Sequence, residues 1–316
     1  MNKAKLAHAI TLALTGAALL GAASSAAAAN ITMYNTFTVE SGGDLGHNNS
    51  TDGWTRVYDG SDPDTIATGP ESQGNKGTIV PWVGTAGGAL PFSYTGSSSL
   101  NWAAELENCG KLEISRADSI ARYSAELATA GLANGAEIDT GAGAWQDNSA
   151  TPTGWKHQTD IGQIKSSINL TITLTVARVD SPSSPGLVND NFGITIFDGQ
   201  DTNVGNYSHH GSWNCPGCAT PRPFTNSNPF GTAGLNFLAY SDTVDMVNGL
   251  TFQAKAGHVY SVYLGGKGVG QWSQNVSDYA LTITAVPEPA TLGLFSVALA
   301  GMGAVRRHPA KPGTLA

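Results

Sequence analysis

The stretch from residue 168 to residue 176 constrains the fold most, because its apolar and polar side chains alternate strictly. Isoleucine, leucine and valine occupy the even positions, and asparagine and threonine occupy the odd ones. Successive side chains of a β-strand point to opposite faces, so this period of two predicts a strand with one buried and one solvent-facing side. Such a strand needs other strands and a covering layer, which indicates a chain built mainly from β-structure.

Four further stretches have strand composition and are bounded by turn-forming residues. The first of them reads FGITIF and is followed by the turn dipeptide Asp198-Gly199. The last two are predicted to pair as a closing hairpin. The pattern as a whole predicts a mainly β protein, an antiparallel, jelly-roll-like β-sandwich with one main helix. The four stretches are residues 192–197, 235–240, 258–264 and 279–286.

One helix is predicted over residues 116–130. Ser115 and Asp118 have the spacing of a capping box, in which a side chain at each position satisfies a free backbone N–H group. Ile120, Tyr123 and Leu127 would share one face of this helix, which we expect to pack over one end of the sandwich. Residues 102–107 are interpreted as a shorter helical turn.

The first 29 residues have the order of a secretory signal peptide. A short basic region is followed by an apolar stretch and then by small residues. Ala27 and Ala29 fit an A-x-A cleavage site before Asn30. We therefore expect export of the chain, with residues 1–29 removed.

The other end of the chain carries a second ordered signal. A short motif is followed by an apolar run, residues 290–305, which contains no charge and ends at two arginines. A helix of this length rises about 24 Å, less than the roughly 30 Å hydrocarbon core of a bilayer. The run is therefore interpreted as a weak membrane anchor suited to brief retention. The motif is Val286, Pro287, Glu288 and Pro289, and the basic pair is Arg306 and Arg307.

These C-terminal residues resemble the PEP-CTERM sorting signal of Gram-negative bacteria. The resemblance implies export, transient insertion in the inner membrane, processing by an exosortase, and delivery to the cell envelope or extracellular matrix. It divides the chain into a signal peptide at 1–29, an ectodomain at 30–285 and a sorting signal at 286–316. The ectodomain resembles other PEP-CTERM ectodomains that lend no catalytic residue.

The charge balance restricts the partners of the ectodomain. The chain has 16 basic and 24 acidic residues, a net charge of −8. Removing the two terminal signals takes away mostly basic residues, so the mature protein is more acidic still. An acidic surface disfavours nucleic acid and anionic membrane as partners, and it is compatible with divalent cations and neutral glycans such as extracellular polysaccharide.

The cysteines and histidines allow more than one interpretation. Cys215 and Cys218 form a C-x-x-C pair, which in an exported protein is expected to close a small disulfide loop. The alternative is a zinc or copper site that adds His209 and His210, because histidine and thiolate suit both metals. A redox role is a third option. Cys109 would then be buried and free, or paired between chains.

Other side chains give weaker indications. Tryptophans in loop-like sequence could stack on sugar rings or plug the ends of the sandwich. A group of aspartates offers oxygen ligands for calcium without the spacing of an EF-hand, and it also fits plain turns. The tryptophans are Trp145, Trp155, Trp213 and Trp272, and the aspartates are Asp59, Asp62 and Asp64.

We found no catalytic motif, and we therefore expect a non-enzymatic surface or matrix protein with a structural or glycan-contacting role and no cofactor. Two alternatives remain open. One is an exported metal-binding protein that uses the histidine and cysteine cluster. The other is a hydrolase of exopolysaccharide, which would need two carboxylates about 5–9.5 Å apart in a groove.

Overall fold

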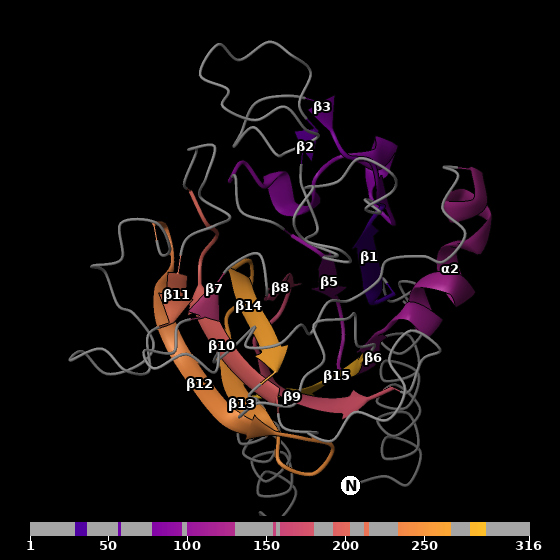
Figure 1. Ribbon diagram of the computed structural model, residues 1–316. Coiled ribbons are helices and arrows are strands. Elements are labelled where there is room, and N and C mark those ends of the chain that lie inside the picture. The colour runs from indigo at the N-terminus through magenta and orange to yellow at the C-terminus, as the bar shows by residue number, and fades with distance from the viewer. Residues whose placement is uncertain are drawn as a thin grey trace, which may run out of the picture.

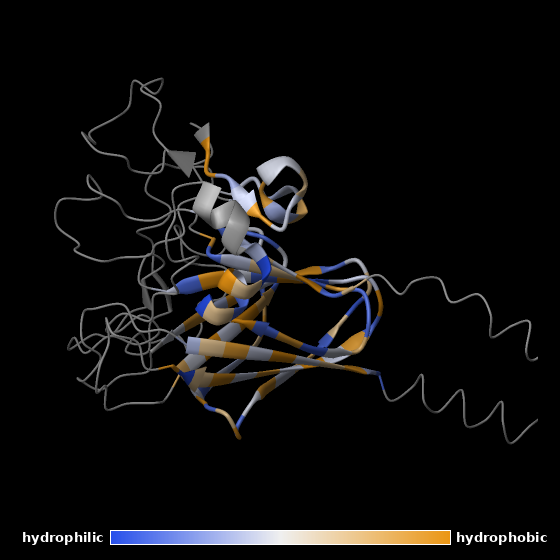
Figure 2. Cartoon of the chain, turned by 90° about the vertical axis from the view of Figure 1, so that its right-hand side faces the viewer, coloured by the Kyte–Doolittle hydropathy of each residue, from blue (hydrophilic) through white to orange (hydrophobic). Residues whose placement is uncertain are grey.

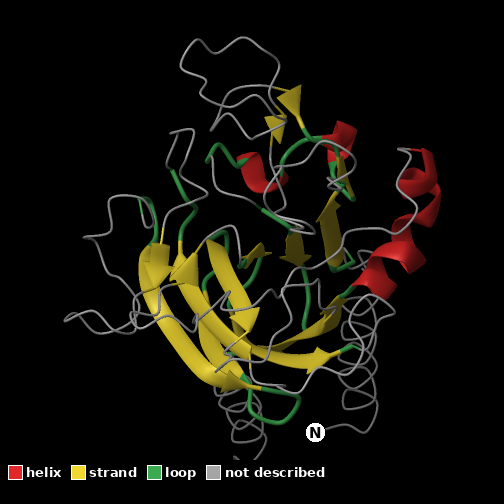
Figure 3. Cartoon of the chain, in the orientation of Figure 1, coloured by secondary structure: helices red, strands yellow, loops and turns green. Residues whose placement is uncertain are grey.

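In the residues that the computed structural model describes, strands predominate and form two main sheets, with one α-helix beside them (Figures 1 and 3). It describes residues 29–36, 56–57, 78–96, 100–129, 154–155, 159–179, 192–202, 212–214, 233–266 and 279–288. The predicted mainly β architecture is confirmed. The strands of the two main sheets are β1 (Ile31–Asn35), β4 (Trp82–Val83), β5 (Trp102–Leu106), β6 (Gly110–Ile114), β8 (Asp160–Ser166), β9 (Leu170–Arg178), β10 (Phe192–Asp198), β12 (Asn236–Val244), β13 (Leu250–Ala254), β14 (Val259–Gly266) and β15 (Tyr279–Pro287).

One sheet has seven strands, in the order β12-β10-β14-β8-β5-β1-β4, and the other has four, in the order β13-β9-β15-β6. Neighbouring strands are antiparallel except β5 and β8, which run parallel and pair Trp102 with Gly162. The expectation of a purely antiparallel arrangement is therefore wrong at this one pair. Two short ladders lie outside these sheets: β2 (Arg56–Val57) pairs with β3 (Thr78–Ile79), and β7 (Gly154–Trp155) pairs with β11 (Ser212–Asn214).

The predicted alternation is seen directly in β9. Its even-numbered apolar side chains are fully or almost fully buried, whereas its threonines lie on the outer face of the four-stranded sheet. The predicted strand began two residues earlier, at Ile168, but this residue lies in the turn before β9 and is 40% exposed. Figure 2 shows hydrophobic and hydrophilic residues alternating along strands of the domain.

The central strands of the seven-stranded sheet are buried on both faces, whereas the edge strand β12 is largely exposed. The inner face of this sheet meets the four-stranded sheet in one core, to which Trp102 and Ile164 contribute from one sheet and Ile172 and Ile283 from the other. Its outer face is covered by a second cluster that includes Tyr94, from the segment between β4 and β5. Strands covered on both faces carry continuous apolar runs rather than alternating ones, and β10 has this pattern.

Burial on both faces explains an error in the sequence analysis. Residues 102–107 were expected to form a helical turn, but residues 102–106 form β5, which lies between β1 and β8. Trp102, Ala103 and Ala104 are all fully buried. The sequence WAAEL has good helix formers and no alternation, and the pairing partners on both sides override that local preference.

The prediction that the last two strands pair as a closing hairpin is also wrong. β14 lies in the seven-stranded sheet between β10 and β8, whereas β15 lies in the four-stranded sheet between β9 and β6. The chain crosses from one sheet to the other between these two strands. Both strands were located correctly from the sequence, but their partners are distant in the chain.

Candidate functional site

The chain enters the first strand and leaves the last strand of the domain at the same end of the two sheets. β1 begins at Ile31, which pairs with Glu105, and β15 ends at Pro287, which pairs with Leu170. Three turns surround these chain ends, at residues 107–109, 167–169 and 255–258. We call this end of the domain, with Asn30 and Glu288 at its two exits, the terminal pole.

Hydrogen bonds join the turns of the terminal pole into one unit. The Asn30 side chain accepts the backbone N–H groups of Glu107 and Asn108 at 2.9 and 3.0 Å and donates to the Asn108 carbonyl at 3.2 Å. The backbone N–H of Ser167 donates to the Leu106 carbonyl at 3.0 Å. The third turn is attached in the same way, because the Gly257 N–H donates to the Ser166 carbonyl at 2.7 Å. Asn30, the expected first residue of the mature chain, thus fixes one turn of the pole.

The sorting sequence begins inside the sheet. β15 pairs with β9 along its whole length, including Val286 with Thr171 and Pro287 with Leu170. On its other side, the pairing with β6 stops at Ala285 opposite Gly110. Val286 is 47% exposed, whereas Ala285 is buried in the core between the sheets. The folded domain and the sorting motif therefore share residues, and no spacer separates them.

Glu288, the acidic residue of the motif, lies near the third turn of the pole. Burial raises the pKa of the Tyr260 phenol, and the charges of Asp198 and Glu288 raise it further. The same phenol oxygen accepts the backbone N–H of Lys255 at 2.8 Å. The His258 ring stacks on Tyr260, and its Nδ1 lies 3.1 Å from a carboxylate oxygen of Asp198. Glu288, the first residue after β15, thus lies near the polar side chains of Tyr260, His258 and Asp198.

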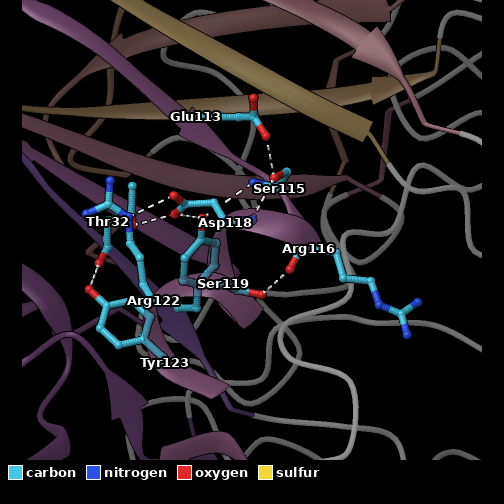
Figure 4. A network of polar contacts seen from close by, with 9 residues as sticks. Thr32, Glu113, Ser115, Arg116, Asp118, Ser119, Arg122 and Tyr123 are labelled. Atoms are coloured by element: carbon cyan, nitrogen blue, oxygen red, sulfur yellow. Dashed lines mark hydrogen bonds and ion pairs between the residues drawn. The ribbon is translucent and has the colours of Figure 1, made fainter. Parts of the chain in front are cut away.

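A second polar cluster attaches helix α2 (Arg116–Thr129) to β1 (Figure 4). The Ser115 hydroxyl accepts the Asp118 N–H at 3.0 Å, which confirms one half of the predicted capping box. The Asp118 carboxylate accepts instead from Thr32 at 2.7 Å, Tyr34 at 2.8 Å and Arg122 at 2.7 Å. Burial and the Asp118 charge raise the pKa of the Tyr34 phenol.

The hydrogen bonds of Asp118 and Tyr123 to Thr32 and Tyr34 dock the helix against β1. The face expected to pack is only partly correct. Tyr123 packs against the core and donates to the Thr32 carbonyl, but Ile120 is 40% exposed. Ser119 is fully buried instead, so the helix buries a different face from the expected one.

A third polar group lies between the two sheets. The Tyr279 hydroxyl donates to the Asp160 carboxylate at 2.9 Å and accepts from the Trp102 ring nitrogen at 3.3 Å. Burial raises the pKa of the Tyr279 phenol well above its ordinary value, with a further contribution from the Asp160 charge. These residues are at most 1% exposed, so this arrangement satisfies buried polar atoms and links the two sheets.

The structure brings together only part of the predicted site residues. Ala29 and Asn30 at the N-terminal exit and Val286, Pro287 and Glu288 at the C-terminal exit lie at the terminal pole. The other predicted residues lie outside the described part of the chain. They are Ala27, His209, His210, Cys215, Cys218, Pro289, Arg306 and Arg307, together with Trp145, Trp272 and the aspartates at 59, 62 and 64.

Cys109 is free and exposed in the turn between β5 and β6, so the expectation of a buried thiol is wrong. Among the residues with described positions, no three His, Cys, Asp or Glu side chains converge as a metal site. Across the same residues, no helix has both the length and the apolar character needed to span a bilayer.

The three turns of the terminal pole were not predicted from the sequence. The signal that could have located them is the Asn-Cys-Gly, Ser-Ile-Asn and Ala-Gly-His sequences, each of which separates two predicted or actual strands. Their convergence could not be derived in this way, because the turns are about 60 to 90 residues apart in the chain.

Comparison with solved structures gives a distant similarity. The chain resembles CorA, which is described as a surface-associated copper-binding protein important in copper acquisition by Methylomicrobium album BG8. The identity is 14%, the match covers 48% of this chain and 90% of CorA, and the TM-score is 0.26. At this TM-score the similarity carries no argument. No curated protein matches the chain at a significant level.

The comparison with protein families concerns the terminal pole directly. Residues 285–307 match the PEP-CTERM protein-sorting motif. The match starts at Ala285, the last core residue of β15, and runs through the apolar segment to the second arginine of the basic pair. This agrees with the motif, the apolar run and the basic residues that the sequence shows in that order. The chain therefore carries a PEP-CTERM protein-sorting signal, which indicates an exported protein that is sorted by an exosortase.

Proposed function

We propose that this protein is a jelly-roll-like β-sandwich that is held briefly in the inner membrane and then released by an exosortase to the cell envelope or extracellular matrix. The observation that carries the proposal is the sorting motif at residues 285–307. The direct continuation of β15 into this motif supports it, because Ala285, the last core residue, is also the first residue of the family match. Residues 290–305 act as the temporary anchor, with Arg306 and Arg307 on the cytoplasmic side.

We further propose a structural or glycan-contacting role for the domain, without catalysis. The outer face of the four-stranded sheet offers a suitable surface, because threonines of adjacent strands lie side by side on it. Thr173 faces Thr251 on one side, with hydroxyl oxygens 2.8 Å apart, and pairs with Thr284 on the other. Each hydroxyl both donates and accepts, which suits contact with the hydroxyl groups of a neutral polysaccharide.

The proposal is tested by replacing Glu288 with alanine. The precursor of this variant is expected to remain in the membrane fraction, whereas the wild-type protein is released. Glu107→Ala is a matched control, because it removes a glutamate from the same end of the domain but outside the motif. Immunoblots of membrane and released fractions measure the outcome. Equal release of the wild type and Glu288→Ala would contradict the sorting role of the motif.

A metal-binding role is the second candidate, and one pairing favours it. β7 and β11 pair Trp155 with Ser212, and this ladder joins two stretches of sequence that both contain histidine. His157 follows Trp155 by two positions, and His210 precedes Ser212 by two positions. Zinc or copper would use His209, His210, Cys215 and Cys218 as ligands.

Elemental analysis of the released protein, together with titration of its thiols, separates this role from a Cys215–Cys218 disulfide. Stoichiometric zinc or copper with titratable thiols supports the metal site, and its loss in Cys215→Ser/Cys218→Ser assigns the ligands. A metal-free protein without titratable thiols at these positions supports the disulfide.

A further inference from the structure

The distance between the folded domain and the predicted anchor is very short. Pro287 is still paired in the sheet, and only Glu288 and Pro289 precede the apolar run that starts at Ala290. Three residue steps of at most about 3.6 Å span about 11 Å. The headgroup layer on each side of a bilayer is about 5–7 Å thick. When the run enters the membrane, the terminal pole therefore lies at the level of the lipid headgroups.

The side chains at the terminal pole fit such a neighbour. Ile168 in the middle turn and Val286 at the end of β15 are 40% and 47% exposed. Ile31, at the start of β1, is 37% exposed. Lys111 and Lys255 are also exposed, one beside the first turn and the other in the third. Lysine ammonium groups contact headgroup phosphates, while aliphatic side chains enter the interface.

The charges at this end favour contact with phosphates more than the net charge of the chain indicates. All three lysines within the described ranges, Lys111, Lys165 and Lys255, are at this end of the domain. Two acidic residues near it already have side-chain partners, because Glu105 accepts from Lys165 at 3.2 Å and Asp198 lies against His258. Glu107 and Glu288 are the remaining carboxylates of the pole, and both are half-buried.

The opposite end of the domain differs. The hairpin between β12 and β13 carries Asp242 and Asp245 on its arms and tip, and its most exposed side chains are Met246 and Val247. β9 runs from Leu170 at the terminal pole to the level of this hairpin, where the Val176 N–H donates to the Asp245 carbonyl. This end provides a control surface far from the pole.

We propose that the terminal pole is a docking surface for phospholipid headgroups, which seats the folded domain on the bilayer before processing. This inference rests on the proposed function, because it requires the apolar run to enter the membrane. The surface combines the exposed Ile168 and Val286 with Lys111 and Lys255. The hydrogen bonds between the three turns hold these side chains in a fixed arrangement.

The thiol of Cys109 allows a direct test, because it is exposed in the first turn of the pole. The exported precursor is purified from membranes of cells that lack the processing enzyme, with Cys215→Ser and Cys218→Ser so that Cys109 is the remaining thiol. An environment-sensitive fluorophore is attached, and the protein is reconstituted into phosphatidylcholine and phosphatidylglycerol vesicles with spin-labelled headgroups in both leaflets. We expect quenching several-fold stronger than for the same label at Met246→Cys in a Cys109→Ser background.

A spacer separates surface affinity from simple tethering. About twelve Gly and Ser residues inserted between Pro289 and Ala290 allow a separation of about 20 Å. We expect the pole to remain quenched in this variant. Lys111→Gln/Lys255→Gln should then reduce the quenching several-fold, whereas Met246→Glu/Val247→Glu, which changes the net charge by the same amount, should leave it unchanged.

The possible results are distinguishable. Failure of the precursor to float with vesicles would overturn both the anchor and the docking surface. Flotation with an unquenched label at Cys109 would overturn the docking surface alone. If the spacer abolishes the quenching, or if both double variants reduce it equally, the pole is only tethered near the membrane. Either result would also overturn the docking surface.

Discussion

Processing of the precursor should depend on how firmly the end of β15 is held in the sheet. We expect the processing enzyme to bind its target segment in an unpaired form, but Val286 and Pro287 are paired with β9. Insertion of about six Gly and Ser residues between Ala285 and Val286 moves the whole motif away from the sheet. The motif and the apolar run themselves remain unchanged.

The expected magnitude follows from the pairs that must open. Two residue pairs lie beyond Ala285, and proline has no N–H to donate, so one or two backbone hydrogen bonds are lost on opening. At about 0.5–1.5 kcal/mol for each bond, opening costs about 1–2 kcal/mol. Val286 is already half exposed and adds little. Since 1–2 kcal/mol corresponds to a factor of about 5–30, the spacer should accelerate processing by about that factor.

Pulse-chase labelling of the precursor and the processed form measures this rate. The matched control places the same insertion between Met246 and Val247, at the exposed hairpin of the opposite end, and should leave the rate unchanged. Thr171→Gly weakens the end of β9 without lengthening the chain, and it should accelerate processing in the same direction. Equal rates for the wild type and the Ala285–Val286 insertion would refute the reasoning.

Four further predictions concern the domain. Asp118→Ala should lower the free energy of unfolding by about 2–5 kcal/mol in urea titrations, because it leaves the buried hydroxyls of Thr32 and Tyr34 without their acceptor. Arg122→Ala removes a largely exposed ion pair and should lower it by less than about 1 kcal/mol, so similar losses in the two variants would contradict the role of Asp118. Gly162→Ala should cost about 3 kcal/mol or prevent folding, since its Cβ would lie 2.1 Å from ring atoms of Trp102, and an unchanged melting temperature would be the contrary result. Hydrogen bonds from the backbone N–H groups of Asn248 and Val247 lower the pKa of Asp245. The hairpin turn should therefore be intact above the ordinary aspartate pKa of about 3.9 and weaken as the pH falls below it. NMR titration of the two amides measures this, and a turn that weakens as the pH rises would contradict the prediction. Thr173→Val/Thr251→Val should preserve the sheet and weaken retention on a neutral extracellular polysaccharide column, and undiminished retention would argue against the threonine face as the contact surface.

Several features of this protein follow from short stretches of sequence. The alternation in residues 170–176 is a property of neighbouring side chains, and it was sufficient to predict β9 and its buried face. The start of helix α2 depends on Ser115 and Asp118, three residues apart, and the cap is present. The sorting motif is likewise a linear order of a short motif, an apolar run and a basic pair, and the family match confirms it.

Other features depend on which strands meet in space. Trp102–Leu106 forms a strand because β1 and β8 pair with it on both sides, although its sequence favours a helix. β14 and β15 were expected to pair, but each is stabilised by distant partners in a different sheet. Local propensity differs by less than about 1 kcal/mol per residue between these alternatives, so burial and pairing with remote segments decide.

The terminal pole illustrates the same division. The sequence predicted an export signal before Asn30 and a strand before the sorting motif, and it contains that motif from Val286. Only the tertiary structure placed both exits at one end of the domain, joined three separate turns there, and showed that the first motif residues are still paired in the sheet. The physical reason is that a sorting signal is written in consecutive residues, whereas a surface is assembled from backbone hydrogen bonds between segments that the chain itself keeps far apart.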